Sequence, residues 1–356
     1  MRKLKIALFS TPWEAVPPIK YGGTELVVYN LAEGLHKNGH LVTVFATGDS
    51  KTSAKLEYIH AKAGYRSDIS WDDKYFSLLH ASYAFAKIQR GGFDLVHNHY
   101  GAWGAAFAKL LDKPFVSTYH GDLTHSRKRA GFEFLKKLFQ NTPMISISHS
   151  QARNTPFKIN WVGNVYNGID ISKFDFNDKP KDYFVWMGRF TSDKGAVESI
   201  LAAKQAGVRL IMAGKIDKFV PADVEYFNKK VRPLIDGDQI KYIGEISHLQ
   251  KVKLLKNARG LIDAIKWNEP FGLVIIEAMV CGTPVIANGF GSVPEVVADQ
   301  ETGFICGSQK DIVKAIKNID QIRRHKCRER VEKYFTAEKM TEDYERAYYK
   351  ILKHKV

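Results

Sequence analysis

Short apolar runs alternate with longer amphipathic segments along the whole chain. In the first half, the pattern predicts strands at residues 5–9, 41–46, 94–97, 114–118 and 144–147, and a helix at residues 24–37. Apolar runs of this length that alternate with helical segments are typical of a parallel β-sheet covered by helices. The first half is therefore expected to form an α/β domain.

A second series of the same kind occupies the second half. Its strands are predicted at residues 184–187, 209–212, 240–243, 260–262 and 284–286, and its helices include residues 195–206 and 248–257. Residues 169–181 carry Asp, Asn, Lys and Pro with little periodicity, so we interpret them as a hinge. The fold class expected is α/β, with two facing Rossmann-like, doubly wound domains and a cleft between them. Ligands of such domains bind at the carboxyl ends of the strands.

Composition and length agree with this two-domain interpretation. The chain has 356 residues, which is too long for one typical hydrophobic core and suggests two domains. Its content of 45% hydrophobic and 26% charged residues is that of an ordinary soluble globular protein. No apolar run reaches the ~20 residues that a spanning helix needs, and the apolar part of residues 1–9 is too short for a signal peptide. Three widely spaced cysteines, Cys281, Cys306 and Cys327, fit neither a disulfide framework nor a zinc site. A reducing cytoplasm is the expected compartment.

The formal net charge of +15 bears on possible partners. An excess of Lys and Arg can attract and bind anionic substrates, anionic lipid or nucleic acid. The same excess can also reflect solvated helix faces and nothing more. The charge by itself leaves both interpretations open.

The most informative stretch is residues 267–278, which read WNEPFGLVIIEA. Two carboxylates, Glu269 and Glu277, stand eight residues apart, and Gly272 opens a helix between them. The first-turn N–H groups of a helix point outward without partners and suit a phosphate. Glu277 lies in an apolar run, where a carboxylate is costly unless it has partners. A sugar joined to a nucleotide through a diphosphate requires such a phosphate cradle together with acceptors for its hydroxyls.

Further motifs follow one another in a fixed order. They are GGTE at 22–25, TYHGD at 118–122, YNGID at 166–170, GRF at 188–190, DKG at 193–195, AGK at 213–215, YIGE at 242–245, GTPVIA at 282–287 and GSVPEVV at 291–297. Together with EPFGL and EAM they resemble the retaining nucleotide-sugar glycosyltransferases of family 4, the glycosyl transferases group 1, which have the GT-B architecture. The resemblance spans nearly the whole chain. It implies an acceptor domain at residues 1–168, a donor domain at 169–336, and a last helix within 337–356 that packs back on the first domain.

The resemblance also assigns roles to individual residues. Arg189 and Lys194 would hold the two phosphates, Glu269 the hydroxyls of the donor sugar, and Glu277 the ribose hydroxyls. His120, at the end of a strand, would lie near the anomeric carbon and the 6-hydroxyl. His120, Arg189, Lys194 and Glu269 are thus the catalytic candidates. Backbone contacts to the donor are implied for Gly22, Gly23, Ile246, Phe271, Gly272 and Leu273.

Without the resemblance, several of these residues have plainer interpretations. Arg189 and Lys194 could be surface cations of a loop, and Glu269 a helix cap. Gly22 and Gly23 could form an ordinary turn before a helix capped by Thr24.

No metal site is expected. Residues 236–238 read Asp-Gly-Asp, which is ordinary turn chemistry. The alternating faces of a strand are expected to separate His97 from His99, which makes a joint site with His120 awkward. The resemblance implies transfer without a metal and without a cofactor, because the nucleotide-sugar is itself a substrate.

Two segments concern the acceptor and the membrane. Residues 13–21 form an apolar loop with two prolines, where acceptor sites of the family lie; packing into the core is the alternative. Residues 127–139 are basic and apolar, so they could lie on an anionic bilayer or form an internal helix with a solvated basic side. The expected location is the cytoplasm, with peripheral contact at the inner face of the membrane as an open hypothesis.

The expected function is retaining transfer of a hexose from a nucleotide diphosphate-sugar to a hydroxyl of a sugar, lipid or small molecule. UDP-sugar is the favoured donor and GDP-sugar the second option. The alternatives are a GT-B nucleotide-sugar 2-epimerase and, ranked lower because the positive charge is scattered, a nucleic-acid-binding protein. Residues 263–266, DAIK, stand where the family commonly has Pro-Ser, which leaves the local contact to the donor open.

Overall fold

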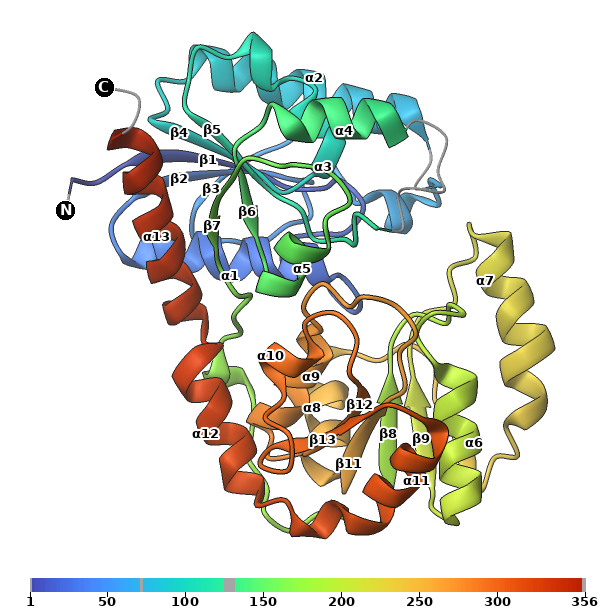
Figure 1. The fold of residues 1–356 in the computed structure, drawn as a ribbon. Coiled ribbons are helices and arrows are strands. Elements are labelled where there is room, and N and C mark those ends of the chain that lie inside the picture. The colour runs from blue at the N-terminus through green and yellow to red at the C-terminus, as the bar shows by residue number, and fades with distance from the viewer. Residues whose placement is uncertain (1, 71–72, 125–131, 354–356) are drawn as a thin grey trace. The chain divides into compact units, whose positions relative to one another are not determined.

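The computed structural model describes residues 2–70, 73–124 and 132–353 and divides into two compact units (Figure 1). Unit 1 comprises Met1–Gly168 and Ala337–Val356, and unit 2 comprises Ile169–Thr336. Each unit has its own parallel sheet and its own buried core. The last helix belongs to unit 1, although it follows unit 2 in the sequence.

Unit 1 contains, within its described residues, a seven-stranded sheet of order β3-β2-β1-β4-β5-β6-β7 in which all neighbours are parallel. The strand order reverses between β1 and β4, as in doubly wound folds. The strands are β1 (Lys5–Phe9), β2 (Leu41–Phe45), β3 (Lys55–Glu57), β4 (Leu95–Asn98), β5 (Phe115–Thr118), β6 (Met144–Ser146) and β7 (Trp161–Asn164). The α-helices are α1 (Gly23–Lys37), α2 (Lys74–Arg90), α3 (Gly101–Ala105), α4 (Phe132–Gln140), α5 (His149–Asn154) and α13 (Ala337–Lys353).

Unit 2 contains a six-stranded parallel sheet of order β10-β9-β8-β11-β12-β13. Here the order reverses between β8 and β11. The strands are β8 (Phe184–Met187), β9 (Leu210–Ala213), β10 (Ile240–Tyr242), β11 (Gly260–Asp263), β12 (Val285–Asn288) and β13 (Gly303–Cys306). The α-helices are α6 (Ala196–Ala206), α7 (Pro221–Tyr226), α8 (His248–Asn257), α9 (Leu273–Val280), α10 (Val293–Val296), α11 (Gln309–Asn318) and α12 (Arg324–Tyr334).

The strands that the apolar pattern predicted are present, and the pattern overlooked three others. All the predicted strands except β10 lie inside the sheets and are largely buried, because helices cover both faces of a parallel sheet, whereas β10 is an edge strand with an exposed Lys241. The overlooked strands β3, β7 and β13 are all at sheet edges and are partly exposed. These three edge strands carry polar or glycine residues, so they lack the continuous apolar run that marks a buried strand.

Helix α13 packs on unit 1 through one apolar face. Met340, Tyr344 and Tyr348 follow one another at four-residue spacing and are fully buried, so they share the buried face of the helix. The helix contacts α1 and β7. Gly34 of α1 faces Thr341, and a methyl group at this position would overlap the threonine side chain. The glycine at this position thus leaves room for the Thr341 side chain against α1.

Two local expectations for the beginning of the chain have clear outcomes. The Thr24 cap is wrong: α1 already begins at Gly23, its N-cap is Gly22, and no side chain caps it. Thr24 therefore lies inside the first turn, too far along to serve as the cap. Trp13 of the apolar loop is buried and its indole N–H donates to the Tyr100 hydroxyl at 2.8 Å, so this residue packs in the core.

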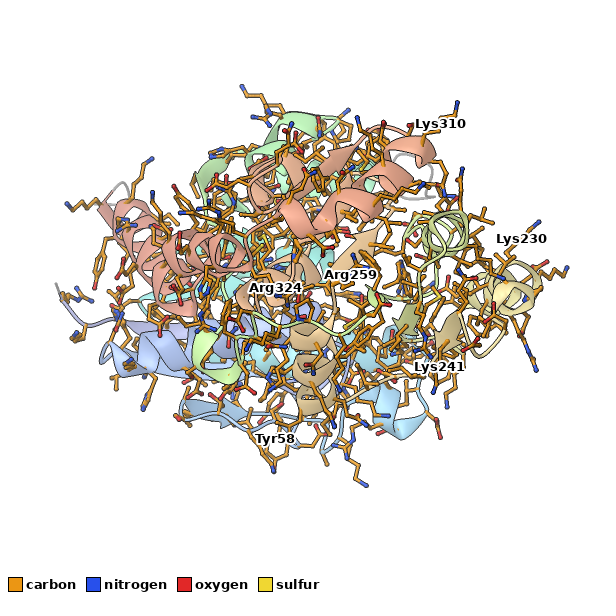
Figure 2. The ribbon with its side chains drawn as sticks, turned by 90° about the horizontal axis from the view of Figure 1, so that it is seen from below. Tyr58, Lys230, Lys241, Arg259, Lys310 and Arg324 are labelled. Carbon is orange, nitrogen blue, oxygen red and sulfur yellow. The ribbon has the colours of Figure 1, made fainter. Side chains whose placement is uncertain are left out.

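Positive charge lies on several separate elements of unit 2. Lys230 and Lys310 extend outward from the ribbon in Figure 2, and Lys241 is also exposed on β10. No helix within residues 2–70, 73–124 and 132–353 has the length and apolar character to cross a bilayer. Of the segment 127–139, residues 127–131 lie outside the described residues, and α4 exposes Phe134 while it buries Phe139. Membrane contact through this segment stays a prediction.

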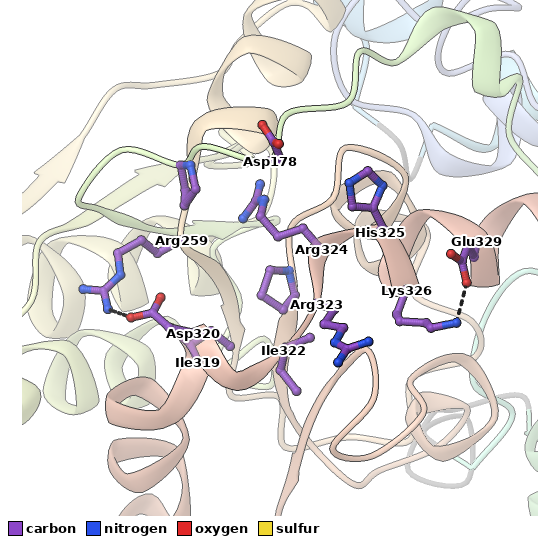
Figure 3. Close-up of a pocket in the computed structure, with 12 residues that line it drawn as sticks. Asp178, Arg259, Ile319, Asp320, Ile322, Arg323, Arg324, His325, Lys326 and Glu329 are labelled. Atoms are coloured by element: carbon purple, nitrogen blue, oxygen red, sulfur yellow. Dashed lines mark hydrogen bonds and ion pairs between the residues drawn. The ribbon is translucent and has the colours of Figure 1, made fainter.

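A pocket of about 660 Å³ lies at the amino-terminal edge of the sheet of unit 2 (Figure 3). Arg259 and Pro284, which directly precede β11 and β12, belong to its lining. Arg324 extends from the start of α12 and is buried. Its guanidinium donates to the carbonyl oxygens of residues 177, 256 and 258 and to the hydroxyl of residue 283, at 2.7–3.0 Å. This arginine joins the beginning of α12 to three connecting segments.

Replacing Arg324 should destabilise unit 2 strongly. We expect Arg324→Met to lower the free energy of unfolding by about 3–5 kcal/mol, because four buried acceptors lose their charged donor. Chemical denaturation of the full chain measures the effect. Arg323→Met is the matched control, since Arg323 is the exposed neighbour, and we expect a change within about 0.5 kcal/mol. Equal stability of the two variants would contradict this role of Arg324.

Candidate active site

The candidate site of unit 2 lies where the strand order reverses. Strands β8 and β11 are parallel neighbours. The strands that follow β8 in the sequence, β9 and β10, lie on one side of this pair, and those that follow β11, β12 and β13, lie on the other. Ligands of open α/β sheets bind outside the carboxyl ends of such strands. The connection after β8 carries Arg189 and Lys194, and the connection after β11 carries Glu269. The backbone N–H of Lys266 donates to the carbonyl of Asp193 at 2.8 Å, which joins the two connections.

Lys194 and Glu269, 75 residues apart in the sequence, are in direct contact. The Nζ atom of Lys194 lies 2.6 Å from Oε2 of Glu269, and the indole N–H of Trp267 donates to the same oxygen at 2.9 Å. The ammonium also lies 4.4 Å from the centre of the Trp267 ring. Glu269 is buried, and its backbone carbonyl accepts from the Ser292 N–H at 2.8 Å. Glu269 is therefore held in place through both its carboxylate and its backbone carbonyl.

Asp263, the last residue of β11, adds a second buried carboxyl group. Burial, together with the nearby Glu269 carboxylate, raises the pKa of Asp263 to about 7, although the Lys194 ammonium opposes the shift. The sequence marked this position only as a departure from the common Pro-Ser pattern. An acidic residue that ends the apolar strand GLID was the signal for a site residue here.

Helix α9 begins beside this cluster. Its N-cap is Gly272, which has left-handed backbone angles of φ 81° and ψ 66° that other residues adopt only with strain. The helix itself runs from Leu273 to Val280, so the predicted helix start after Phe-Gly is confirmed. The Phe271 side chain is buried and packs on the Phe335 ring at 5.7 Å, so Phe271 can offer a ligand only its backbone. The first-turn N–H groups of α9 form a site suited to an anion.

Glu277 lies about one turn into α9, and its carboxylate forms an ion pair with Lys251 of α8. Both side chains are largely buried. The partner that a carboxylate in such an apolar helix needs is thus this lysine, which no sequence pattern singled out. Both glutamates of the Glu-x7-Glu element are paired with a lysine from another segment.

Arg189 and Ile246 are not part of the Lys194–Glu269 contact. The Nε atom of Arg189 lies 3.6 Å from Oδ2 of Asp223 in α7, and the arginine side chain is 44% exposed. Burial raises the pKa of Asp223, and Arg189 opposes that rise. Ile246 is half-buried just before α8. The structure thus joins Lys194 to Glu269, whereas it pairs Arg189 with an aspartate that the sequence did not suggest.

In unit 1 the remaining candidates stand in segments that follow strands. Gly22 and Gly23 open α1 after β1, and His120 follows β5. The Nε2 atom of His120 lies 2.9 Å from Nδ1 of His99, and Nε2 of His99 lies 3.2 Å from Nδ1 of His97. The expectation that a strand separates His97 from His99 is wrong, because residues two apart share one face. The three imidazoles form a continuous row.

These histidines are neutral at pH 7. Burial lowers the pKa of His97 and His99 well below the usual value, and neighbouring histidines lower it further. Burial also lowers the pKa of His120 to about 4. The row therefore offers polar, uncharged groups at the carboxyl ends of β4 and β5.

Family models match almost the whole chain. The model described as glycosyl transferases group 1 matches residues 169–334, and the model described as glycosyltransferase family 4 matches residues 21–173. The chain belongs to this family of glycosyltransferases. The resemblance inferred from the motifs is confirmed.

Named relatives and solved structures agree with this assignment. The N-acetyl-alpha-D-glucosaminyl L-malate synthase of Bacillus anthracis is 25% identical, over 99% of this chain and 98% of its own length. Sucrose-phosphate synthase from Thermosynechococcus elongatus has a TM-score of 0.82 at 22% identity, over 99% of this chain and 100% of that one. HepE from Anabaena, solved in complex with UDP-glucose, has a TM-score of 0.72 at 17% identity, over 98% and 100% of the two chains. The glycosyltransferase therefore has the GT-B fold that the sequence predicted.

The residues weighed for metal binding have other contacts in this glycosyltransferase. Asp236 Oδ1 accepts from the backbone N–H groups of residues 238 and 240 at 3.0 and 2.9 Å, which is turn chemistry. The three cysteines are buried and free. Across the described part of the chain, no group of three or more His, Cys, Asp and Glu side chains is arranged to hold a metal ion.

Proposed function

We propose that this glycosyltransferase moves a hexose from a UDP-sugar to a hydroxyl of a sugar, lipid or small-molecule acceptor, with retention of configuration and without a metal ion. One observation carries the proposal: the amino end of α9 is flanked by two buried glutamates, each of which is paired with a lysine. This arrangement provides an anion site and two sets of hydroxyl acceptors within one short element.

The chemistry of the donor suits these groups. Departure of a nucleoside diphosphate develops negative charge on the phosphate oxygens, which fixed cations and backbone N–H groups stabilise. Lys194 would supply the cation and the first turn of α9 the N–H groups. With Lys194 engaged by the pyrophosphate, the Glu269 carboxylate would accept hydrogen bonds from sugar hydroxyls. Glu277, deeper in α9, would accept the ribose hydroxyls, and Arg189 would add a second, more exposed cation.

We further propose a front-face mechanism. The bond between C1 and the phosphate oxygen breaks, the acceptor oxygen bonds to C1 on the same face, and the acceptor proton passes to the leaving phosphate oxygen. A double-displacement route would need a carboxylate nucleophile beside C1. The candidate residue of unit 1, His120, is a neutral imidazole in a row of histidines.

The relatives support the choice of donor and acceptor class. HepE was solved in complex with UDP-glucose, and the Bacillus anthracis relative is named for the synthesis of an N-acetylglucosaminyl derivative of L-malate. A UDP-linked hexose and a small hydroxyl acceptor are therefore the pair to examine first, before GDP-linked sugars.

A panel of UDP-, GDP- and ADP-sugars tests the proposal. We expect UDP-sugars to raise the melting temperature and to be hydrolysed slowly without acceptor, because a ligand at about 100 times its Kd adds about 2.7 kcal/mol of stability. Proton NMR of the transfer product should show the anomeric configuration of the donor, and added EDTA should leave the rate unchanged. Conversion of the donor to an epimer without an acceptor, or stabilisation by none of the sugars, would overturn the proposal.

A further inference from the structure

A chain of hydrogen bonds in unit 1 runs from the C-terminal helix to His120. The Tyr348 hydroxyl of α13 lies 2.6 Å from Nδ1 of His97 in β4. His97 Nδ1 then faces His99 Nε2 at 3.2 Å, and His99 Nδ1 faces His120 Nε2 at 2.9 Å. On its other side, His97 Nε2 lies 2.8 Å from the Thr118 hydroxyl. Tyr348, His97 and His99 are all buried.

Donors and acceptors in this chain constrain one another. A neutral imidazole carries one N–H and one bare nitrogen, so each ring has one donor and one acceptor. At each contact between two ring nitrogens, one nitrogen must carry the proton and the other must be bare. The tautomer of one ring therefore fixes the tautomer of the next, and the whole row can have only two arrangements, which point in opposite directions.

Tyr348 decides between the two arrangements. Tyr348 is fully buried, and a buried O–H donor without an acceptor is costly. Nδ1 of His97 is the acceptor that the geometry offers, so this nitrogen is bare and the proton of His97 is on Nε2, from which it donates to Thr118. Nε2 of His99 also faces this Nδ1, at 3.2 Å, and two bare nitrogens this close would repel each other. Nε2 of His99 therefore carries the proton and shares the one lone pair of His97 Nδ1 with the closer Tyr348 hydroxyl. Nδ1 of His99 is consequently bare and accepts the N–H at Nε2 of His120.

We propose that Tyr348 is a positioning residue that acts through His97 and His99 to hold His120 in the tautomer with the proton on Nε2. Nδ1 of His120 then has a free lone pair and serves as a hydrogen-bond acceptor. Where His120 meets the donor sugar, which rests on the proposed function, this nitrogen selects a group that can donate, such as a hydroxyl. It disfavours a carboxylate or a bare ether oxygen at the same place.

The test is the tautomer itself, measured in the absence of any substrate. Nitrogen-15 NMR of labelled histidine distinguishes a protonated from a bare ring nitrogen, and His120→Gln identifies the His120 signals. We expect wild-type His120 to have a protonated Nε2 and a bare Nδ1. In Tyr348→Phe both arrangements become allowed, so the His120 signals should move toward the average of the two tautomers.

Tyr344→Phe is the matched control. Tyr344 is also fully buried on α13, but its hydroxyl lies 3.2 Å from the Thr118 hydroxyl and not beside a ring nitrogen. We expect this variant to keep the wild-type tautomer of His120. If Tyr348→Phe does not fold, His99→Met breaks the same chain one step nearer to His120 and should release the tautomer. A protonated Nδ1 in the wild type, or a tautomer unchanged in Tyr348→Phe and His99→Met, would overturn the proposal.

Turnover gives a second readout that depends on the proposed function. If half of the molecules carry the wrong tautomer, the competent fraction is halved and kcat/KM should fall about twofold in Tyr348→Phe but not in Tyr344→Phe. Because the NMR result needs no substrate, it stands even if the donor proves to be another sugar. A released tautomer with unchanged kcat/KM would overturn the role of Nδ1 in sugar binding.

Discussion

Lys194→Ala should lower kcat/KM for the UDP-sugar by about 10²- to 10³-fold, the loss typical for removal of one group that stabilises transition-state charge. Lys194 is partly buried against Glu269 and the Trp267 ring, so its charge acts in a low-dielectric setting. The loss should appear mainly in kcat, because charge on the leaving diphosphate develops in the transition state. Steady-state kinetics with a saturating acceptor measures it.

Lys266→Ala is the matched control for this experiment. Lys266 follows the same strand as Glu269 and also forms an ion pair of 2.6 Å, with Glu198, but its side chain is 46% exposed. We expect kcat/KM within about twofold of wild type, because exposed pairs contribute little. Arg189→Ala, at an exposed position beside Asp223, should give an intermediate loss. Equal rates for wild type and Lys194→Ala would remove Lys194 from the mechanism.

Glu277→Gln should raise the Kd for UDP by about 10- to 150-fold, since hydrogen bonds to a charged acceptor contribute about 1.5–3 kcal/mol. The buried carboxylate has its negative charge balanced by Lys251, and its two oxygens can accept from two ribose hydroxyls. Glutamine keeps the shape of the side chain and removes the charge. Thermal stabilisation by UDP, and isothermal titration, should therefore both weaken.

A nucleotide without ribose hydroxyls is the control for Glu277. Wild type should bind 2′,3′-dideoxy-UDP about as weakly as Glu277→Gln binds UDP, because the hydrogen bonds between ribose hydroxyls and a charged carboxylate are missing in both cases. The variant should hardly distinguish the two nucleotides. A variant that still prefers UDP by the wild-type factor would show that Glu277 does not contact the ribose.

Sequence patterns predicted the buried strands well but missed the edge strands β3, β7 and β13, and found only β10 among the strands at sheet edges in the described residues. Strand β1 has its last four residues buried and appears as an apolar run, whereas β7, which reads WVGN, is partly exposed along its length. Helices with marked apolar spacing, such as α13, were placed correctly because one face of the helix must be buried. The start of α1 was misplaced because a glycine N-cap gives no side-chain signal.

The candidate site shows the same division. The resemblance of motifs singled out Lys194, Glu269 and Glu277, and the apolar surroundings of Glu277 indicated that it needs a partner. Asp263 and Lys251 were missed, because an acid at a strand end and one lysine among several in α8 carry no distinctive spacing. The identity of a charge partner depends on which segments the sheet order brings together.

The sequence by itself determined the two α/β units, their central strands, and the Glu-x7-Glu helix start, because local periodicity and backbone preference act over a few residues. Only the tertiary structure decided which groups meet. Lys194 reaches Glu269 across 75 residues, and Tyr348 reaches His97 across 251. Such contacts follow from parallel strand order and from the docking of α13, and neither leaves a pattern in the neighbouring residues of the chain.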